Sequence, residues 1–206
     1  MANEQTAFVL KQAKWSQYLA RSSAWLFALI LLIILSPLFV VIGILIKLES
    51  KGSIFFTQVR GGLNGQYFTI YKFRTMYDEP EKLSLDIDVV ENDPRITKVG
   101  YILRTTSLDE LPQLINIVKG DMAFVGPRPT MPSQTDNYNE YQKQRLFVKP
   151  GVTGLAQISG RNALTWDEKI DLDVEYINRK NIRYDLYIIL QTFFKVIKSE
   201  GVYSNE

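Results

Sequence analysis

The sequence contains neither cysteine nor histidine. Without cysteine, the chain has no disulfide framework, no thiolate nucleophile and no cysteine-based zinc site. Without histidine, it lacks the most frequent general base and the most frequent ligand of transition metals. Any chemistry must therefore come from carboxylates, lysine, arginine, tyrosine and hydroxyl groups, and an oxygen-liganded ion such as Mg²⁺ is the only metal that we expect. The lack of disulfides is compatible with a cytoplasmic catalytic face.

A strong excess of one charge is also missing. The formal net charge is +2 over 206 residues, whereas a nucleic-acid-binding domain usually carries a pronounced, clustered basic excess. We therefore predict no nucleic-acid partner. With 46% hydrophobic residues, a chain of this length can form one compact domain and a membrane element, but hardly two independent cores.

A long, uncharged and largely apolar run extends from Ala24 to Ile46. It is long enough to cross a bilayer core of about 30 Å. A cleaved signal peptide would have a shorter apolar region, followed by small residues at a cleavage site and then by polar sequence. No such site follows Ile46. The run therefore predicts a membrane segment that is retained in the protein.

Ser36 and Pro37 interrupt this run near its middle. Proline lacks a backbone donor and clashes with the carbonyl four residues earlier, so the pair predicts a kink in which Ser36 can hydrogen-bond a freed carbonyl. The basic residues on the two sides do not decide the orientation by the positive-inside rule. A re-entrant helix with both ends in the cytoplasm and a simple crossing both fit these flanks, which are Lys11, Lys14 and Arg21 before the run and Lys47 and Lys51 after it.

The sequence after the membrane run predicts a small β-hairpin. Ile54–Val59 and Tyr67–Thr75 are typical of strands, and the glycine-rich segment 61–65 between them is typical of a turn. In the second strand Lys72 and Arg74 alternate with aromatic residues, so one face is expected to present two cations. Such a face is either a binding site for an anion or simply a solvated surface.

The rest of the chain is expected to be mainly helical. Residues 78–95 are acidic and aperiodic, which is typical of a loop. Apolar residues from Leu111 onward follow helical spacing, and Gly120 suits the end of that helix. Asp185 to Lys198 carries an apolar stripe that is either buried or placed at a membrane interface. The fold class is therefore α+β, with interfacial amphipathic helices.

The segment from Arg104 to Gln113 concentrates residues that suit catalysis. Ser107 and Glu110 have the spacing of a capping box, so a plain helix start explains much of the pattern. Pro112 is comfortable only near the start of a helix, and Asp109 could itself be the cap. In either case two adjacent carboxylates lie where a helix dipole favours ionisation, and an ionised carboxylate suits a nucleophile or a Mg²⁺ ligand.

Several loops could bind phosphate. Arg104, Arg128 and Arg161 offer planar guanidinium groups, and glycines beside them allow backbone amides to approach an anion. Each loop taken alone is also explained as an ordinary turn.

These segments together resemble one protein family, the bacterial sugar transferases, also called monotopic phosphoglycosyl transferases. The resemblance covers roughly residues 21–201, and its length matches the small single-domain members. Six motifs carry it in order, namely 71–76 (YKFRTM), 106–113 (TSLDELPQ), 119–122 (KGDM), 125–129 (VGPRP), 149–157 (KPGVTGLAQ) and 160–162 (GRN).

The resemblance implies a re-entrant helix that breaks at Ser36 and Pro37, so that both termini are cytoplasmic. The expected organisation is an N-terminal extension (1–20), a re-entrant membrane helix (21–50) and a membrane-associated catalytic domain (51–206) on the cytoplasmic face of the bacterial inner membrane.

It also implies a reaction. Asp109 would attack the β-phosphate of a UDP-sugar and release UMP, with Glu110 assisting through Mg²⁺ that both carboxylates bind. Polyprenyl (undecaprenyl) phosphate would then displace the aspartate and give a polyprenyl-diphospho-sugar. The implied partners are the UDP-sugar, polyprenyl phosphate, membrane lipid and the glycosyltransferases that act next in glycoconjugate synthesis. The expected substrate-binding residues are Lys72, Arg74, Arg104, Arg128 and Arg161.

Two other functions remain open at this stage. The chain could be a nucleotide-sugar hydrolase, which would release UMP without a lipid acceptor. It could also be a non-catalytic membrane scaffold of the same fold, although Asp109 and Glu110 are both present.

Overall fold

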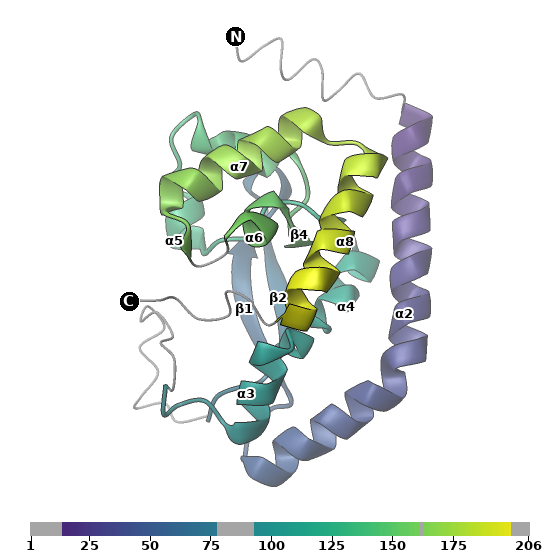
Figure 1. Ribbon diagram of the computed structural model, residues 1–206, viewed down its shortest axis with the longest axis vertical. Helices are drawn as coiled ribbons and strands as arrows, with labels where there is room; N and C mark the ends of the chain where they lie inside the picture. Colours follow the sequence, from purple (N-terminus) through teal and green to yellow (C-terminus); the bar gives the residue numbers. More distant parts are fainter. Residues whose placement is uncertain (1–13, 78–92, 161–162, 199–206) are drawn as a thin grey trace.

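The computed structural model describes residues 14–77, 93–160 and 163–198. A long N-terminal helix lies along one side of a body that consists of helices around a β-hairpin and a second, smaller sheet (Figure 1). The elements of the first half are α2 (Lys14–Glu49), β1 (Phe55–Gly61), η1 (Leu63–Gly65), β2 (Tyr67–Phe73), α3 (Lys98–Thr105), η3 (Leu108–Glu110) and α4 (Gln113–Lys119). The second half contains β3 (Ala123–Val125), α5 (Pro132–Thr135), η4 (Gln142–Phe147), β4 (Gly151–Thr153), α6 (Leu155–Ser159), α7 (Trp166–Arg179) and α8 (Ile182–Lys198).

Helix α2 is continuous but bent (Figure 1). Pro37 lies inside it and cannot donate to the carbonyl of Ile33 four residues earlier. The hydroxyl of Ser36 donates to that carbonyl instead, at 2.8 Å. The kink and the role of Ser36 expected from the sequence are therefore confirmed. By length and composition, the part from Ser22 to Glu49 is apolar enough to cross a membrane.

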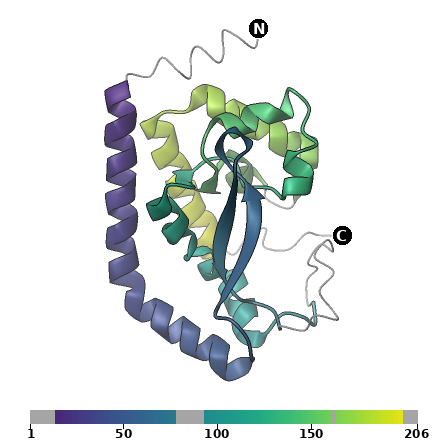
Figure 2. The same cartoon turned by 180° about the vertical axis from the view of Figure 1, so that it is seen from behind.

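Both halves of α2 contact the rest of the protein (Figure 2). In the first half, Ala28 is fully buried against α4, and the Trp25 indole donates to the carbonyl of Val118 at 3.0 Å. In the second half, Ile46 belongs to a core cluster with residues of the hairpin and α3. At the end of the helix, the Glu49 carboxylate accepts hydrogen bonds from the first backbone amides of α3. The whole apolar helix thus lies against one body.

The hairpin predicted from the sequence is confirmed. Strands β1 and β2 pair antiparallel from Phe55↔Phe73 to Gly61↔Tyr67. In the turn, Asn64 and Gly65 adopt left-handed backbone angles, with φ of 55° and 76°, which glycine and asparagine tolerate best. The boundaries differ slightly from the expectation, because β1 extends to Gly61 and β2 ends at Phe73.

The expected pair of cations on one face of this hairpin does not form. Arg74 follows the end of β2, is buried, and donates to the carbonyls of Ser50 and Lys51 and to the Ser50 hydroxyl. Its guanidinium therefore ties the end of α2 to the hairpin. Lys72 instead lies beside the carboxylates of Asp109 and Glu110. The alternation pattern failed here because the strand ends one residue before Arg74.

A second sheet was not predicted from the sequence. Strands β3 and β4 are parallel and only three residues long each. Gly126 and Gly151 bring the loops beside these strands into backbone contact, since a Cβ on Gly151 would lie 2.1 Å from the amide nitrogen of Gly126. Behind this sheet, Tyr176 and Ile188 anchor a core cluster formed by α7 and α8.

The apolar stripe predicted near the C-terminus lies on α8 and remains largely uncovered. Ile188 is fully buried, but five large apolar side chains of α8 are more than half exposed, as are Ile102 on α3 and many residues of α2. Large exposed apolar patches indicate an interaction surface. The five on α8 are Ile182, Leu186, Leu190, Phe193 and Phe194.

Candidate active site

The segment that carries Asp109 and Glu110 is a separate short turn. Helix α3 ends at Thr105, the backbone of Ser107 is left-handed (φ 56°), and η3 covers only Leu108–Glu110. Ser107 makes no capping hydrogen bond with its side chain, so the capping-box interpretation is wrong. Helix α4 begins at Gln113, directly after Pro112, where the missing N–H of proline leaves no hydrogen bond unmade. Gly120 ends α4 in a left-handed conformation, as expected.

The two carboxylates lie side by side in a largely buried position, with side-chain exposures of 14% for Asp109 and 13% for Glu110. Lys72 Nζ from β2 lies 2.8 Å from Glu110 Oε1 and 3.9 Å from Asp109 Oδ2. Arg128 Nη2, from the loop after β3, lies 2.8 Å from the same oxygen of Glu110. Three segments far apart in the sequence therefore converge on one acidic pair.

The environment separates the pKa values of the two acids. Burial raises the pKa of Asp109, and the negative charge of Glu110 adds to this rise, while Lys72 opposes it. Burial also acts to raise the pKa of Glu110, but the charges of Arg128 and Lys72 and their hydrogen bonds outweigh it and lower that pKa below the ordinary range. We expected the surroundings to favour ionisation of both carboxylates. They do so for Glu110, whose pKa is lowered, whereas they raise the pKa of Asp109. Paired acids with separated pKa values are typical of catalytic sites.

The predicted phosphate-binding residues are distributed unequally around this pair. Arg104 donates to the Thr75 hydroxyl at 2.8 Å, and its charge lowers the pKa of Asp109, so it faces the site. Lys72 and Arg128 contact the acids directly, whereas the hydrogen bonds from Arg74 to Ser50 and Lys51 join α2 to the hairpin. Arg161 lies outside the described residues. Phosphate binding by these side chains stays a prediction.

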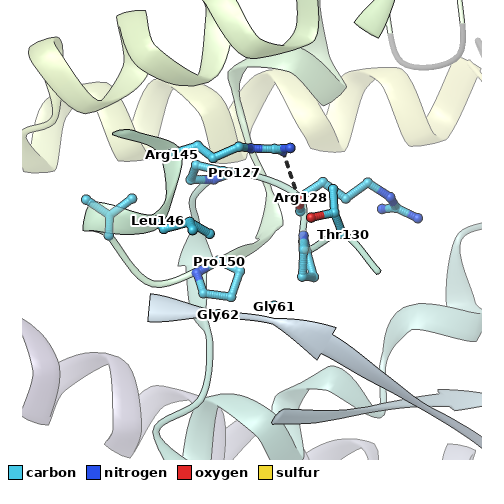
Figure 3. Close-up of a pocket in the computed structure, with 10 residues that line it drawn as sticks. Gly61, Gly62, Pro127, Arg128, Thr130, Arg145, Leu146 and Pro150 are labelled. Atoms are coloured by element: carbon cyan, nitrogen blue, oxygen red, sulfur yellow. Dashed lines mark hydrogen bonds between the residues drawn. The ribbon is translucent and has the colours of Figure 1, made fainter. Parts of the chain in front are cut away.

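A buried arginine that the sequence did not single out supports the Arg128 loop. Arg145, only 4% exposed, donates to Asp173 Oδ2 at 2.6 Å and to the Tyr138 hydroxyl at 2.7 Å. It also donates to the carbonyl of Arg128 at 3.0 Å (Figure 3). Its guanidinium also faces the ring of Trp166 at 5.1 Å. Arg145 thus fixes the backbone from which Arg128 reaches Glu110. The one signal in the sequence was the position of Asp173, a charge on the buried side of α7.

An open pocket lies beside this loop, with about 210 Å³ of empty space that includes open solvent. It is lined by residues that include Gly61, Arg145 and Pro150, but neither of the two acids lines it. Figure 3 shows the Arg128 side chain running away from Leu146 and Pro150. Arg128 therefore both lines this pocket and reaches Glu110 with its side chain.

The acidic pair fits a magnesium ion that is shared with a substrate. Among the described residues there is no group of three acidic side chains that could hold a metal ion. However, Mg²⁺ is usually bound by one or two carboxylates together with substrate phosphates. Asp109 and Glu110 supply two adjacent carboxylates, and burial and the charge of Glu110 raise the pKa of Asp109, so further positive charge here would be stabilising.

Comparison with known proteins gives consistent matches. Residues 15–199 match the bacterial sugar transferase family. An uncharacterised sugar transferase of Bacillus subtilis, EpsL, is 46% identical over 157 residues, which are 76% of each chain. The exopolysaccharide production protein ExoY of Rhizobium meliloti is 39% identical over 197 residues, 89% of this chain and 87% of the relative. A UDP-glucose:undecaprenyl-phosphate glucose-1-phosphate transferase of Escherichia coli is 36% identical over 196 residues, 91% of this chain but 42% of the relative.

Proposed function

Because the chain belongs to the bacterial sugar transferase family, we propose that it transfers a sugar 1-phosphate from a UDP-sugar to polyprenyl phosphate through an intermediate on Asp109. The name of the Escherichia coli relative gives UDP-glucose as donor and undecaprenyl phosphate as acceptor. A relative from Salmonella typhimurium, 35% identical, is named for galactose and the same acceptor. The observation that carries the proposal is the buried acidic pair that meets Lys72 and Arg128.

In the first step, a carboxylate oxygen of Asp109 attacks the β-phosphorus of the UDP-sugar. The new bond joins Asp109 to phosphorus, the bond from this phosphorus to the bridging oxygen breaks, and UMP leaves with the electron pair. In the second step, an oxygen of polyprenyl phosphate attacks the same phosphorus and releases Asp109. The products are UMP and a polyprenyl-diphospho-sugar, and each step exchanges one phosphorus–oxygen bond for another.

The residues around Asp109 suit this chemistry. An anionic nucleophile and a diphosphate repel each other, so catalysis needs fixed positive charge near the phosphoryl oxygens. Lys72 and Arg128 lie next to the nucleophile, and Glu110 holds both in place while it remains ionised. Mg²⁺ bound by Asp109 and Glu110 would supply Lewis-acid stabilisation of the phosphoryl oxygens.

Glu110→Gln tests the assignment of roles within the pair. Removing this charge takes away one cause of the raised pKa of Asp109 and leaves Lys72 and Arg128 free to face it. The pKa of Asp109 should therefore fall, and the acid limb of the pH profile for UMP release should move to lower pH. The plateau rate should fall on the order of 10²-fold, because the fixed positive charge is no longer held in place.

The matched control for this variant is Glu140→Gln, which changes a carboxylate that is 92% exposed. It should leave both the pH profile and the plateau unchanged. An acid limb that stays in place or moves to higher pH in Glu110→Gln would contradict the coupling between the two acids.

We also propose that α2 enters the membrane and returns to the cytoplasmic face of the bacterial inner membrane. Pro37 divides the 28-residue, mostly apolar span from Ser22 to Glu49 into stretches of 15 and 13 residues. At about 1.5 Å per residue these span roughly 22 and 20 Å, each short of a bilayer core of about 30 Å. Both stretches also pack against the same catalytic body, which favours placement of both ends on one side.

Cysteine labelling tests this topology directly, because the chain has no native cysteine. Ser22→Cys and Lys51→Cys introduce exposed thiols near the two ends of the apolar run. A membrane-impermeant reagent should label both from the cytoplasmic side and neither from the outside. Labelling of the two positions from opposite sides would establish a simple crossing and exclude the re-entrant arrangement.

A further inference from the structure

Arg60 lies near the end of β1 and shares one face of the hairpin with Lys72. The register pairs Lys72 with Phe56 and Arg60 with Phe68. Side chains directly opposite each other in an antiparallel pair lie on the same face, as do alternate residues along one strand. Arg60 is four residues from Phe56, about 13 Å along the strand. Arg60 and Lys72 therefore lie near opposite ends of the same face of the hairpin.

Arg60 has no anionic partner in the described part of the chain. Its side chain is half-buried and donates to the neutral amide oxygen of Gln58. No carboxylate in residues 14–77, 93–160 or 163–198 lies within ion-pair distance of it. Burial and the positive charge of Arg128 lower the pKa of Arg60 to about 10. Burying a charge without a partner is costly, and the nearby charge of Arg128 adds repulsion, so an anion that contacts both guanidinium groups would be stabilising.

Arg128 is able to bind such an anion while it keeps its contact with Glu110. Its side chain is 52% exposed, and its hydrogen bond to Glu110 uses one nitrogen, Nη2. A guanidinium has five N–H donors, so further donors remain for a ligand. The loop that carries Arg128 is tied to β1, because the amide of Gly61 donates to the carbonyl of Thr130 at 2.9 Å. This hydrogen bond joins the end of β1, which carries Arg60, to the loop that carries Arg128.

We propose that Arg60 and Arg128 form a second anion subsite, which binds a phosphoryl group other than the one attacked by Asp109. This inference rests on the proposed function for the identity of the ligand. Two phosphates fit the chemistry, namely the nucleotide α-phosphate that leaves in UMP and the phosphate of the polyprenyl acceptor. In both cases the guanidinium groups would donate paired N–H bonds to phosphate oxygens.

The test uses the full chain in detergent and two variants, Arg60→Gln and Arg60→Lys, with Arg183→Gln as a matched control on an exposed arginine. UMP is titrated by calorimetry without lipid, and KM for undecaprenyl phosphate is measured at saturating UDP-sugar. If the subsite binds the nucleotide, Arg60→Gln should weaken UMP binding at least tenfold. If it binds the acceptor, UMP binding should be unchanged and KM for undecaprenyl phosphate should rise at least tenfold.

Arg60→Lys keeps the charge but loses the planar pair of donors, so it should show a smaller change in the same quantity. It also serves as the test if Arg60→Gln does not fold. If the affinity for UMP and the KM for undecaprenyl phosphate of the folded variants both stay within twofold of the values for Arg183→Gln, the proposed subsite is wrong. The UMP titration involves no covalent step, so it reports on Arg60 even if Asp109 proves not to be the nucleophile.

Discussion

Asp109→Asn should abolish the release of UMP from a UDP-sugar, with a rate loss of at least about 10³-fold. The change keeps the size of the side chain but removes the anion that attacks phosphorus. It should not destabilise the fold, because burial already disfavours the charge of Asp109. UMP release is measured without lipid acceptor, so that only the first step is observed.

The matched control is Asp167→Asn, which changes an exposed carboxylate in the first turn of α7. It should release UMP at the wild-type rate. Normal release by Asp109→Asn would show that this carboxylate has a structural or metal-binding role. A different outcome would indicate a hydrolase. In that case the wild type, without lipid acceptor, would keep releasing UMP at the same rate, far beyond one equivalent per enzyme molecule.

Arg145→Met should produce the largest loss of stability among the predicted variants. It leaves Asp173 buried at 2% side-chain exposure without its cation, and Asp173 Oδ1 already lacks a hydrogen-bond partner. Breaking a buried pair in this way costs about 3–5 kcal/mol, which corresponds to a fall of roughly 6–20 °C in Tm for a chain of this size. UMP release by the folded fraction should also slow, because the carbonyl of Arg128 loses its donor.

The pH dependence of this variant follows from the pKa of Asp173. Burial raises that pKa, and although Arg145 opposes the rise, it still reaches about 6 in the wild type. Without Arg145 the pKa should be higher. A carboxyl group whose pKa is higher in the folded than in the unfolded state binds its proton more tightly when folded, so stability rises as pH falls between the two values. Arg145→Met should therefore lose less stability at pH 5 than at pH 8.

Two further variants check this interpretation. Arg145→Met combined with Asp173→Leu removes both charges and should regain part of the lost stability. Arg179→Met breaks the exposed pair with Glu175, which solvent screens, and should leave the free energy of unfolding nearly unchanged. Equal losses in the Arg145 and Arg179 variants would show that the buried pair does not support the loop that carries Arg128.

Local features of the fold were predictable because they depend on neighbouring residues. The hairpin around Asn64 and Gly65, the end of α4 at Gly120 and the bend associated with Pro37 each follow from backbone preferences of a few residues. The hydroxyl of Ser36 is three residues from the carbonyl that it satisfies. Such short-range relations can be derived from the sequence.

Features that depend on tertiary contacts were predicted less well. Lys72 and Arg74 looked equivalent in the sequence, but only the structure shows that one reaches the acids and the other the end of α2. The pairing of Arg145 with Asp173 joins residues 28 positions apart, and β3 and β4 are too short for a periodic pattern. The separated pKa values of Asp109 and Glu110 likewise arise from burial and from cations on other segments.

The most direct test of the account is the mass of the enzyme after it reacts with a UDP-sugar and Mg²⁺ in the absence of polyprenyl phosphate. If hydrolysis of the intermediate is slow, the wild-type protein should gain one phosphosugar, on the peptide that contains Asp109, and the adduct should disappear when undecaprenyl phosphate is added. The Asp109→Asn variant should gain none. An adduct on a different residue, or full turnover by Asp109→Asn, would contradict the assignment of Asp109 as the nucleophile.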